Sequence, residues 1–550
     1  MEETNYQTIK LPVAPTPTTA EKHPVVVVGA GPVGLSMAID MALRGQPVVV
    51  LDDDNKFSTG SRAICFAKRT LDIWDRLDVG ERMVDKGVSW NVGKVFFRDE
   101  EVWSFNLLPE PLHRRPAFIN LQQYYCEGYL YEKAQSLGID LRAKHKVTAL
   151  ENHNTHTELT VETPDGDYQI TADWVIACDG ARSPLRSMIG ECSQGRIFQD
   201  RFLIADVRMK AHYPAERWFW FDPPFHPNQS VLLHSQPDDV WRIDFQLGWD
   251  ADPVEEVKEE NVRPRVQALL GKDVEFDFEW ISIYTFACER MDKFRFGRLL
   301  FAGDAAHRVS PFGARGANSG IQDTDNLAWK LDLHLRGLAP ESILDTYCSE
   351  RRFAADENLQ HSSRSTDFIT PKSEISKLFR DTVLRLAKTH DFARSMVNSG
   401  RLSTPSSYDQ SPLNTQDVDR FAGSVQIGGP AVDAPLRNQS EPSWWLSHLG
   451  LSFTLAMFNP SDKQLPALQK LQQEPLLNVV LIYPGQDVPT NAPTGFTVLT
   501  DHFGMWQQRY DAQSGAAYLF RPDQHLTARW RQPKADLVQA ALARACGQTL

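Results

Sequence analysis

The chain has 550 residues, enough for more than one domain and a large core. Its 42% hydrophobic and 23% charged residues are ordinary for a globular protein, whereas its net charge of −13 argues against a nucleic-acid partner. The seven dispersed cysteines form no C-x-x-C pair and no metal-ligand spacing, so we expect no metal and a reducing, cytoplasmic location. No apolar stretch reaches the roughly 18 residues that a membrane span requires.

The first elements predict a dinucleotide site. The stretch VVVVGAGPVGLSMAIDMALRGQPVVVLDDD, residues 25–54, predicts a strand, a turn, a helix and a second strand, and its β-branched run is typical of a buried parallel strand. Three glycines follow the first strand at the G-x-G-x-x-G spacing: Gly29, Gly31 and Gly34. This spacing allows a tight turn, close approach of a pyrophosphate to a helix N-terminus, and close helix–strand packing. Asp52 ends the second strand, where its carboxylate can accept hydrogen bonds from a ribose hydroxyl.

The later elements predict an α/β protein built from several units. Alternating strands and helices are typical of a doubly wound sheet, and the aromatic-rich strands after them are typical of an inserted antiparallel sheet. We expect a flexible N-terminal arm (1–22), a dinucleotide-binding domain in two parts (23–190 and 291–395, the second with further helices), a substrate-binding sheet domain (191–290), a linker (396–425) and a small α/β domain (426–550).

Two later motifs place further carboxylates at strand ends. DWVIACDGARSPLR contains Asp179, and GRLLFAGDAAHRVSPFGARGANSG contains Gly303 and Asp304 before a glycine-rich helix start. A carboxylate at a strand end can bind a ribitol or ribose hydroxyl, and a glycine-rich turn can lie close to a flat ring and its phosphates. Either segment alone could be a structural turn.

Together the three motifs resemble those of the class A FAD-dependent aromatic hydroxylases, which have the para-hydroxybenzoate hydroxylase fold. GSRAICFAKRTLDIW, NLQQYYCEGYL, YTFACERMDKFRFGRLLFAGDAAH and YCSERR resemble its 3-(3-hydroxyphenyl)propionate and phenol hydroxylase branch. The resemblance spans most of residues 23–365 and implies a Rossmann-like FAD-binding domain. The sequence contains no second strand–G-x-G-x-x-G–helix unit, so NADPH or NADH is expected as a transient co-substrate.

The resemblance also implies which residues bind FAD. Asp52 would hold the adenosine ribose, and Arg62 and Gln123 match positions near the ribityl and pyrophosphate groups. Asp304 would bind the ribityl or pyrophosphate, and the turn from Pro311 to Asn318 would run along the isoalloxazine. Alternatively, Arg62 forms a surface salt bridge and Gln123 lies on a solvated helix face. The complete predicted set is Gly29, Gly31, Pro32, Gly34, Asp52, Arg62, Gln123, Asp179, Gly303, Asp304, Pro311, Gly316, Ala317 and Asn318.

The implied activity is an NAD(P)H-consuming monooxygenase that hydroxylates a phenol or phenolic acid through a flavin C4a-hydroperoxide. Its expected partners are a small aromatic substrate, molecular oxygen and a second copy in a homodimer, and the expected context is aromatic catabolism. Three alternatives stay open: Baeyer–Villiger or epoxidising oxygenation of a polycyclic substrate, a flavin-dependent reductase or dehydrogenase, and a non-enzymatic flavoprotein.

Candidate substrate contacts lie in the aromatic-rich strands. In VWRIDFQL, residues 240–247, the alternation places Arg242 on the polar face, where it could pair with a substrate carboxylate or form a surface charge. His234 and Tyr213 are candidate phenol partners. Five aromatic residues could line a pocket or pack in the core: Trp218, Trp220, Trp241, Tyr284 and Phe286. The stretch WFWFDP resembles a halogenase signature but lacks its isoleucine, so we interpret it as aromatic strand packing.

The C-terminal residues 426–550 resemble the thioredoxin-like tail of the phenol hydroxylase branch. The likeness depends on GGPAVDAPL, LIYPG and YLFRPDQHLTARW. Thioredoxins act through a C-x-x-C pair, but this region contains only Cys546. Dithiol chemistry is therefore excluded, and we expect a packing or dimerisation role.

Overall fold

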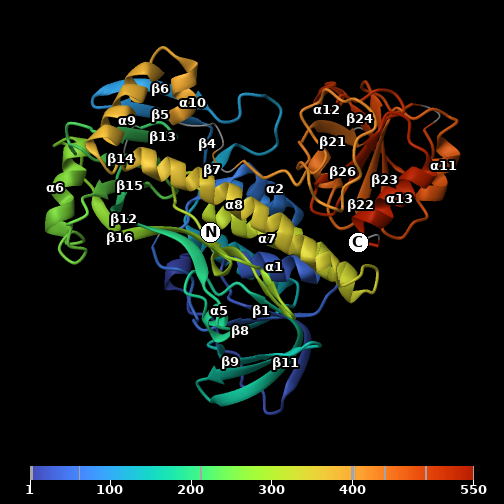
Figure 1. Cartoon of the computed structure of the whole chain (residues 1–550), viewed down its shortest axis with the longest axis horizontal. Coiled ribbons are helices and arrows are strands. Elements are labelled where there is room, and N and C mark those ends of the chain that lie inside the picture. Colours follow the sequence, from blue (N-terminus) through green and yellow to red (C-terminus); the bar gives the residue numbers. More distant parts are fainter. Residues whose placement is uncertain are drawn as a thin grey trace.

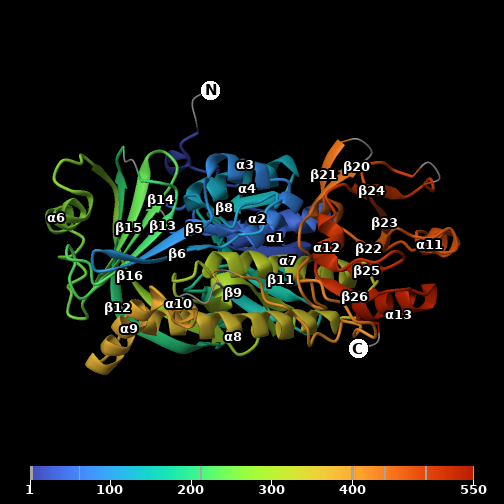
Figure 2. The same cartoon turned by 90° about the horizontal axis from the view of Figure 1, so that it is seen from above.

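The computed structural model describes residues 4–60, 62–210, 213–397, 402, 404–438, 441–489 and 492–548. Within them the chain forms two eight-stranded sheets, a seven-stranded sheet and a three-stranded sheet, with helices packed around them (Figure 1). Seen from above, the second sheet, the first sheet and the C-terminal sheet follow one another along the long axis (Figure 2). Among the described residues, none of the helices has the length and apolar character needed to cross a bilayer.

The first sheet is the doubly wound sheet that the sequence predicts. Its central order is β17-β18-β11-β1-β2-β8, with β10 paired to β11 and β9 paired to β10. Val25–Val28 pair in parallel with both neighbouring strands and are buried, so the β-branched run fills the core on both faces. Its strands are β1 (Glu21–Val28), β2 (Val48–Asp52), β8 (Asp140–Ala143), β9 (Lys146–Asn152), β10 (Thr157–Thr163), β11 (Gly166–Ala177), β17 (Arg295–Phe296) and β18 (Leu299–Phe301).

The second sheet contains the aromatic-rich strands expected within residues 191–290, and it also includes strands from an earlier part of the chain. Its order is β19-β16-β12-β15-β14-β13-β5-β6, and β5 pairs with β13 in parallel. Strands β5 and β6 of this sheet therefore lie before the expected boundary at residue 191. The alternation of apolar and polar residues along a strand does not show which other strand it pairs with. Its strands are β5 (Val92–Phe97), β6 (Glu100–Asn106), β12 (Ser193–Arg208), β13 (Arg217–Phe221), β14 (Ser230–Ser235), β15 (Val240–Leu247), β16 (Asp277–Met291) and β19 (His307–Arg308).

Helices pack around these sheets and connect them. Helix α8 (Ile343–Ile369) has 27 residues and runs from the second sheet to the C-terminal domain (Figure 2). The three-stranded sheet consists of β3 (Cys65–Ala67), β4 (Val88–Trp90) and β7 (Phe118–Asn120). The remaining helices of this part are α1 (Pro32–Leu43), α2 (Lys68–Arg76), α3 (Gly80–Lys86), α4 (Gln123–Ser136), α5 (Pro184–Met188), α6 (Glu259–Leu270), α7 (Gly316–Leu335), α9 (Glu374–Ala387) and α10 (Asp391–Val397).

The C-terminal domain contains a mixed seven-stranded sheet in the order β21-β20-β24-β23-β22-β25-β26. β22, β23 and β24 are parallel, and β25 runs antiparallel to β22, in agreement with the predicted thioredoxin-like fold. Its elements are β20 (Pro435–Asn438), β21 (Glu441–Trp444), β22 (Phe453–Phe458), β23 (Leu477–Pro484), β24 (Thr497–Asp501), β25 (Ala517–Phe520), β26 (Leu526–Trp530), α11 (Leu465–Leu471), α12 (Met505–Tyr510) and α13 (Ala535–Ala545).

The predicted flexible arm and the predicted linker are both packed against the rest of the chain in their described parts. The N-terminal arm buries Tyr6, whose ring packs edge-on against Phe57 and Tyr125, so its described part is docked rather than free. The predicted linker is irregular, yet Tyr408 and Leu413 within it are buried because the segment lies between two domains. Residues 398–401 and 403 of that linker lie outside the described residues.

Candidate active site

One continuous cavity of about 1420 Å³ is lined by residues of both the first and the second sheet. Small-ligand pockets usually measure about 300–1,000 Å³, so this cavity has room for more than one ligand. Of the predicted FAD contacts, all line the cavity except Gly34, in the first turn of α1, and Gly303, which immediately precedes Asp304. The structure therefore brings segments from four distant parts of the sequence to one place.

The three glycines of the turn after β1 have different structural roles. Gly29 has φ +107°, and a Cβ there would lie 2.4 Å from the carbonyl oxygen of Cys178. A Cβ on Gly34 would lie 1.9 Å from the carbonyl oxygen of Gly29. No described atom lies within 4 Å of the corresponding position on Gly31, which lines the cavity and caps α1. The first and third glycines thus close the turn, and the second leaves the backbone open for a phosphate.

Two of the predicted carboxylates brace backbone turns at the cavity wall. Asp52 accepts hydrogen bonds from the backbone nitrogens of Ala30 and Asp54, at 2.6 and 2.8 Å. Asp179 accepts from the hydroxyl of Ser183 at 2.8 Å, whereas its Oδ1 has no partner in the described part of the chain. Burial raises the pKa of both carboxyl groups. Both side chains therefore shape the site and keep acceptor capacity toward the cavity.

Asp304 differs from them, because its carboxylate has no hydrogen-bond partner among the described residues. The Asp304 side chain lines the cavity, and its exposed surface faces this open space. The surrounding protein raises its pKa by desolvation, although His307 and Arg308 act in the opposite direction. An unpaired carboxylate in such surroundings is a site for hydroxyl donors of a ligand.

Other predicted FAD contacts hold the loops that form the wall. Gln123 accepts from the backbone nitrogen of Ala63 at 3.1 Å and donates to Glu127 at 2.7 Å. Asn318 accepts from the backbone nitrogen of Ala67 at 2.8 Å, which ties α7 to β3. Neither side chain lies on a solvated helix face.

The second sheet supplies three polar side chains to the same cavity: Arg217 and His234 are buried, and Asp244 is partly buried. Arg217 on β13 is 9% exposed, and its Nε has no hydrogen-bond partner within the described residues. Asp244 on β15 has an unpaired Oδ1, and burial raises its pKa to about 6. Burial, together with Arg217 and Arg242, keeps the pKa of His234 well below 6.5, so its imidazole is neutral at neutral pH. Unpaired polar groups are costly to bury, which indicates that a ligand pairs with them.

Arg242 faces the cavity, but its guanidinium already has partners. Its Nε lies 3.0 Å from Oδ1 of Asp206, and its Nη1 donates to the backbone oxygen of Arg62 at 3.0 Å. The predicted alternation of β15 is confirmed, since Trp241 and the other apolar positions pack on the opposite face. Arg242 therefore braces the wall. Sequence reasoning missed Arg217, although a lone charge beginning the aromatic strand RWFWF was the available signal.

Tyr213 does not line the cavity, so its position does not support the predicted contact with a substrate. Its ring packs edge-on against Trp218 and Trp241 at centroid distances of 5.4 and 5.5 Å, on the opposite face of the second sheet. Tyr284 and Phe286 line the cavity, whereas all three candidate tryptophans belong to the outer cluster. The aromatic strand at 218–223 is thus a packing element.

These residues fit FAD. The open backbone at Gly31 and the N-terminus of α1 suit a pyrophosphate, and Asp304 offers a free acceptor for ribityl hydroxyls. The turn from Pro311 to Asn318 borders the same space and can lie along a flat ring.

Comparisons with known proteins agree with this geometry. Residues 22–362 match the family described as the FAD binding domain. The chain is 30% identical to the 12-dehydrotetracycline 5-monooxygenase/anhydrotetracycline 6-monooxygenase of Streptomyces rimosus. This match extends over 370 residues and covers 64% of this chain and 70% of the relative. It is 25% identical over 543 residues, 94% of this chain and 91% of the relative, to the 3-(3-hydroxy-phenyl)propionate/3-hydroxycinnamic acid hydroxylase of Mycolicibacterium gilvum.

Among solved structures, the flavin-dependent monooxygenase PieE in complex with FAD and substrate has the same fold. The TM-score is 0.79 at 21% identity, and the match covers 96% of this chain and 99% of that chain. The chain therefore belongs to the FAD binding domain family and is an FAD-dependent monooxygenase of the class that hydroxylates aromatic compounds.

Proposed function

We propose that the chain hydroxylates a phenolic aromatic compound, with NADPH or NADH as the electron donor and molecular oxygen as the second substrate. The observation that carries this proposal is the group formed by Arg217, His234 and Asp244 on the second-sheet side of the cavity. A cation, a neutral imidazole and a carboxylate in one cavity suit a substrate that carries an acidic hydroxyl group.

Each side chain has a distinct part in this proposal. Arg217 binds an anionic oxygen of the substrate, either a phenolate or a carboxylate, because its guanidinium has an unpaired donor. Asp244 accepts the phenolic proton, since its pKa of about 6 leaves it ionised at neutral pH. Neutral His234 can donate or accept a hydrogen bond beside it. The chemistry that bound FAD supplies is the transfer of electrons to oxygen and the activation of that oxygen.

The rest of the wall orients the ring and excludes water. Apolar side chains from β12, β14, β16 and the turn before α7 line the same cavity as the polar group. They are Phe202, Ile204, Leu232, Ile283, Phe286 and Phe312. Water exclusion favours oxygen transfer to the ring over loss of the activated oxygen as peroxide.

A substrate with fused rings is a second candidate, favoured by the size of the cavity. The cavity has a volume of about 1420 Å³, which exceeds that of a usual single-ligand pocket. The volume that FAD does not fill is therefore available to a substrate larger than one ring. The 30% identical relative is named as a monooxygenase of 12-dehydrotetracycline and anhydrotetracycline, which adds support for a polycyclic phenol. A Baeyer–Villiger or epoxidising reaction on such a substrate would also add one oxygen atom, so only the structure of the product separates these outcomes.

The test is a panel of monocyclic phenols, phenolic acids and polycyclic phenols, each assayed with NADH and NADPH. A true substrate should stimulate NAD(P)H oxidation and give a product heavier by one oxygen atom, with the new hydroxyl group located by NMR. The matched control is each compound's methyl ether, which cannot give up a phenolic proton and should stimulate far less. Equal stimulation by phenol and ether, or a reduced product, would contradict the proposal.

A further inference from the structure

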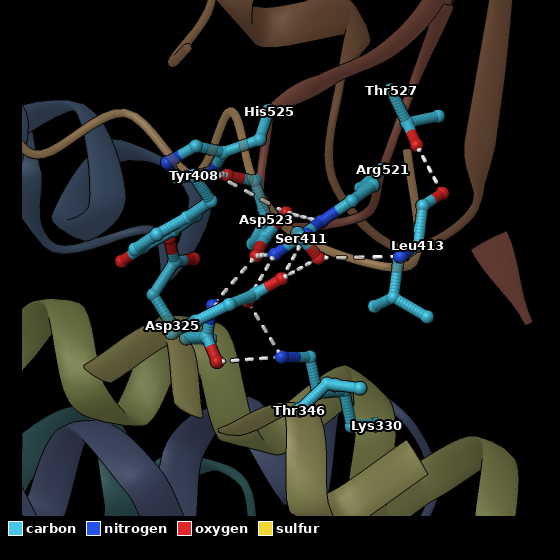
Figure 3. A network of polar contacts seen from close by, with 12 residues as sticks. Asp325, Lys330, Thr346, Tyr408, Ser411, Leu413, Arg521, Asp523, His525 and Thr527 are labelled. Carbon is cyan, nitrogen blue, oxygen red and sulfur yellow. Dashed lines mark hydrogen bonds and ion pairs between the residues drawn. The ribbon is translucent and has the colours of Figure 1, made fainter. Parts of the chain in front are cut away.

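Paired, buried charges join the C-terminal domain to the FAD-binding domain. Arg521, on the turn between β25 and β26 (residues 521–525), is fully buried and donates to both oxygens of Glu350 on α8, at 2.7 and 3.0 Å. Lys330 on α7 donates to the same carboxylate at 2.8 Å. Figure 3 shows Arg521, Asp523 and Ser411 facing Lys330 across this interface. The interface thus fixes the turn against two helices of the FAD-binding domain.

The next residue along α8 connects this interface to the FAD site. Arg351 donates from Nε to Asp323 and from Nη1 to the hydroxyl of Tyr408, both at 2.5 Å. Asp323 also accepts from the backbone nitrogen of Gly303 at 2.8 Å and from Nε2 of His307 at 2.7 Å. Gly303 immediately precedes the carboxylate at position 304 that faces the cavity. Only two side chains therefore separate the hydroxyl of Tyr408 from this FAD-binding turn.

Arg351 also holds the beginning of α7. Its Nη2 donates to the backbone oxygen and to the hydroxyl of Ser319, at 3.0 and 2.9 Å. The three residues before Ser319, at positions 316–318, line the cavity. One guanidinium thus fixes both the carboxylate turn and the helix start that border the predicted position of the flavin ring.

Tyr408 itself is attached to the C-terminal domain. Its backbone nitrogen donates to the backbone oxygen of Gly428 at 2.8 Å, and its ring lies 4.9 Å from the ring of His525 between centroids. The guanidinium of Arg521 lies 5.7 Å from the centroid of the same ring. The position of the tyrosine hydroxyl therefore depends on how the C-terminal domain is docked.

We propose that the C-terminal domain is a positioning element for FAD. Through Tyr408 and Arg351 it holds Asp323, and thereby the turn at 303–304 and the first turn of α7, in the arrangement that binds the cofactor. These three side chains are positioning residues, because none of them lines the cavity. A domain without a C-x-x-C pair thus contributes to cofactor binding rather than to electron transfer.

The first test measures FAD affinity without any aromatic substrate, so its failure is distinct from failure of the proposed hydroxylation. Full-length apoprotein is titrated with FAD, and binding is followed by flavin fluorescence. Tyr408→Phe should raise the FAD dissociation constant at least about tenfold. The matched control is Tyr510→Phe, which removes a buried hydroxyl bonded to Val432 inside the C-terminal domain. It should lower thermal stability without changing FAD affinity.

Thermodynamic linkage supplies a second test on the wild-type chain. If the docked domain favours FAD binding, FAD must stabilise the docked domain by the same factor. FAD should therefore slow amide hydrogen exchange in residues 521–526, and Tyr408→Phe should remove this effect. An unchanged dissociation constant for Tyr408→Phe, an equal rise for Tyr510→Phe, or no slowing of exchange in the wild type would overturn the proposal.

Discussion

The molecule has two buried polar regions, and they differ in how their charges are paired. At the cavity, Arg217 and Asp244 keep buried atoms without a hydrogen-bond partner within the described residues, and the Asp304 carboxylate faces the open space. At the interdomain interface, Glu350 accepts from several donors, including both Arg521 and Lys330. Because an unpaired buried polar group is costly, the unpaired groups at the cavity indicate a ligand-binding site. The paired charges at the interface indicate a structural role. Substitution of Glu350 should therefore act mainly on the stability of the fold, and substitution of the cavity residues mainly on ligand binding.

The largest expected effect is on stability and lies at the interface. Glu350→Gln would leave buried Lys330 without its paired carboxylate and Arg521 with Asp523 alone. Breaking such a buried pair costs about 3–5 kcal/mol in the free energy of unfolding. Chemical denaturation should detect this loss. The matched control is Glu255→Gln at the exposed pair with Lys258, where the cost should stay below about 1 kcal/mol. Similar losses in the two variants would contradict the contrast.

At the cavity, Arg217→Met should affect substrate binding and spare the fold. Loss of a hydrogen bond to a charged group costs about 1.5–3 kcal/mol, which corresponds to roughly a 10- to 100-fold fall in kcat/KM. Denaturation should show no loss of stability, because the guanidinium is buried without a full set of partners. Arg208→Met, at an exposed arginine of the same sheet, is the control and should leave both quantities unchanged. A destabilised but fully active Arg217→Met variant would show that this residue stabilises the fold and does not bind the substrate.

Asp304→Ala should weaken FAD binding by about 1–3 kcal/mol while the fold survives, because the ligand hydroxyls lose their acceptor. Flavin content after purification and the FAD dissociation constant report the effect, and far-ultraviolet circular dichroism reports the fold. Asp292→Ala, at an exposed carboxylate nearby in the sequence, should retain normal flavin content. Normal flavin content in Asp304→Ala would show that this carboxylate does not bind FAD.

A smaller effect concerns pH. Burial raises the pKa of Asp244 from 3.8 to about 6, so its carboxylate is ionised above pH 6 and protonated below it. If it accepts the phenolic proton, kcat/KM should fall as the pH drops through about 6, and Asp244→Asn should lack this limb.

The stability effect of the same group has the opposite direction. The folded state binds more protons than the unfolded state between about pH 4 and 6, so ionised Asp244 destabilises the fold above pH 6. Asp244→Asn should therefore be at least as stable as the wild type at pH 7, measured by thermal unfolding. A destabilised variant with an unchanged pH profile would contradict both expectations.

The smallest expected effect is at Cys546. This thiol is buried, and burial raises its pKa to about 12, so it is not a nucleophile at neutral pH. Cys546→Ser should leave turnover and FAD reduction unchanged in stopped-flow assays. Slower flavin reduction in the serine variant would show that the C-terminal domain takes part in redox chemistry.

The sequence predicts the cofactor side of the molecule better than the substrate side. The turn at 29–34 and the carboxylates at 52, 179 and 304 could be recognised because glycine spacing and strand ends have local causes. For Arg217 the only local signal is a lone charge at the start of an aromatic strand, and this signal does not show which face of the strand lines a cavity, because that depends on which strands pair with it. The parallel pairing of β5 with β13, and the docking of the N-terminal arm, likewise depend on contacts between distant parts of the sequence.

One measurement tests the central claim most directly: turnover under ¹⁸O₂ with the best phenol of the panel, with product mass and NAD(P)H consumption followed together. The account predicts one ¹⁸O atom in each product molecule and one NAD(P)H consumed for each product formed. NAD(P)H consumption with all of the oxygen recovered as hydrogen peroxide, or a product without ¹⁸O, would contradict it.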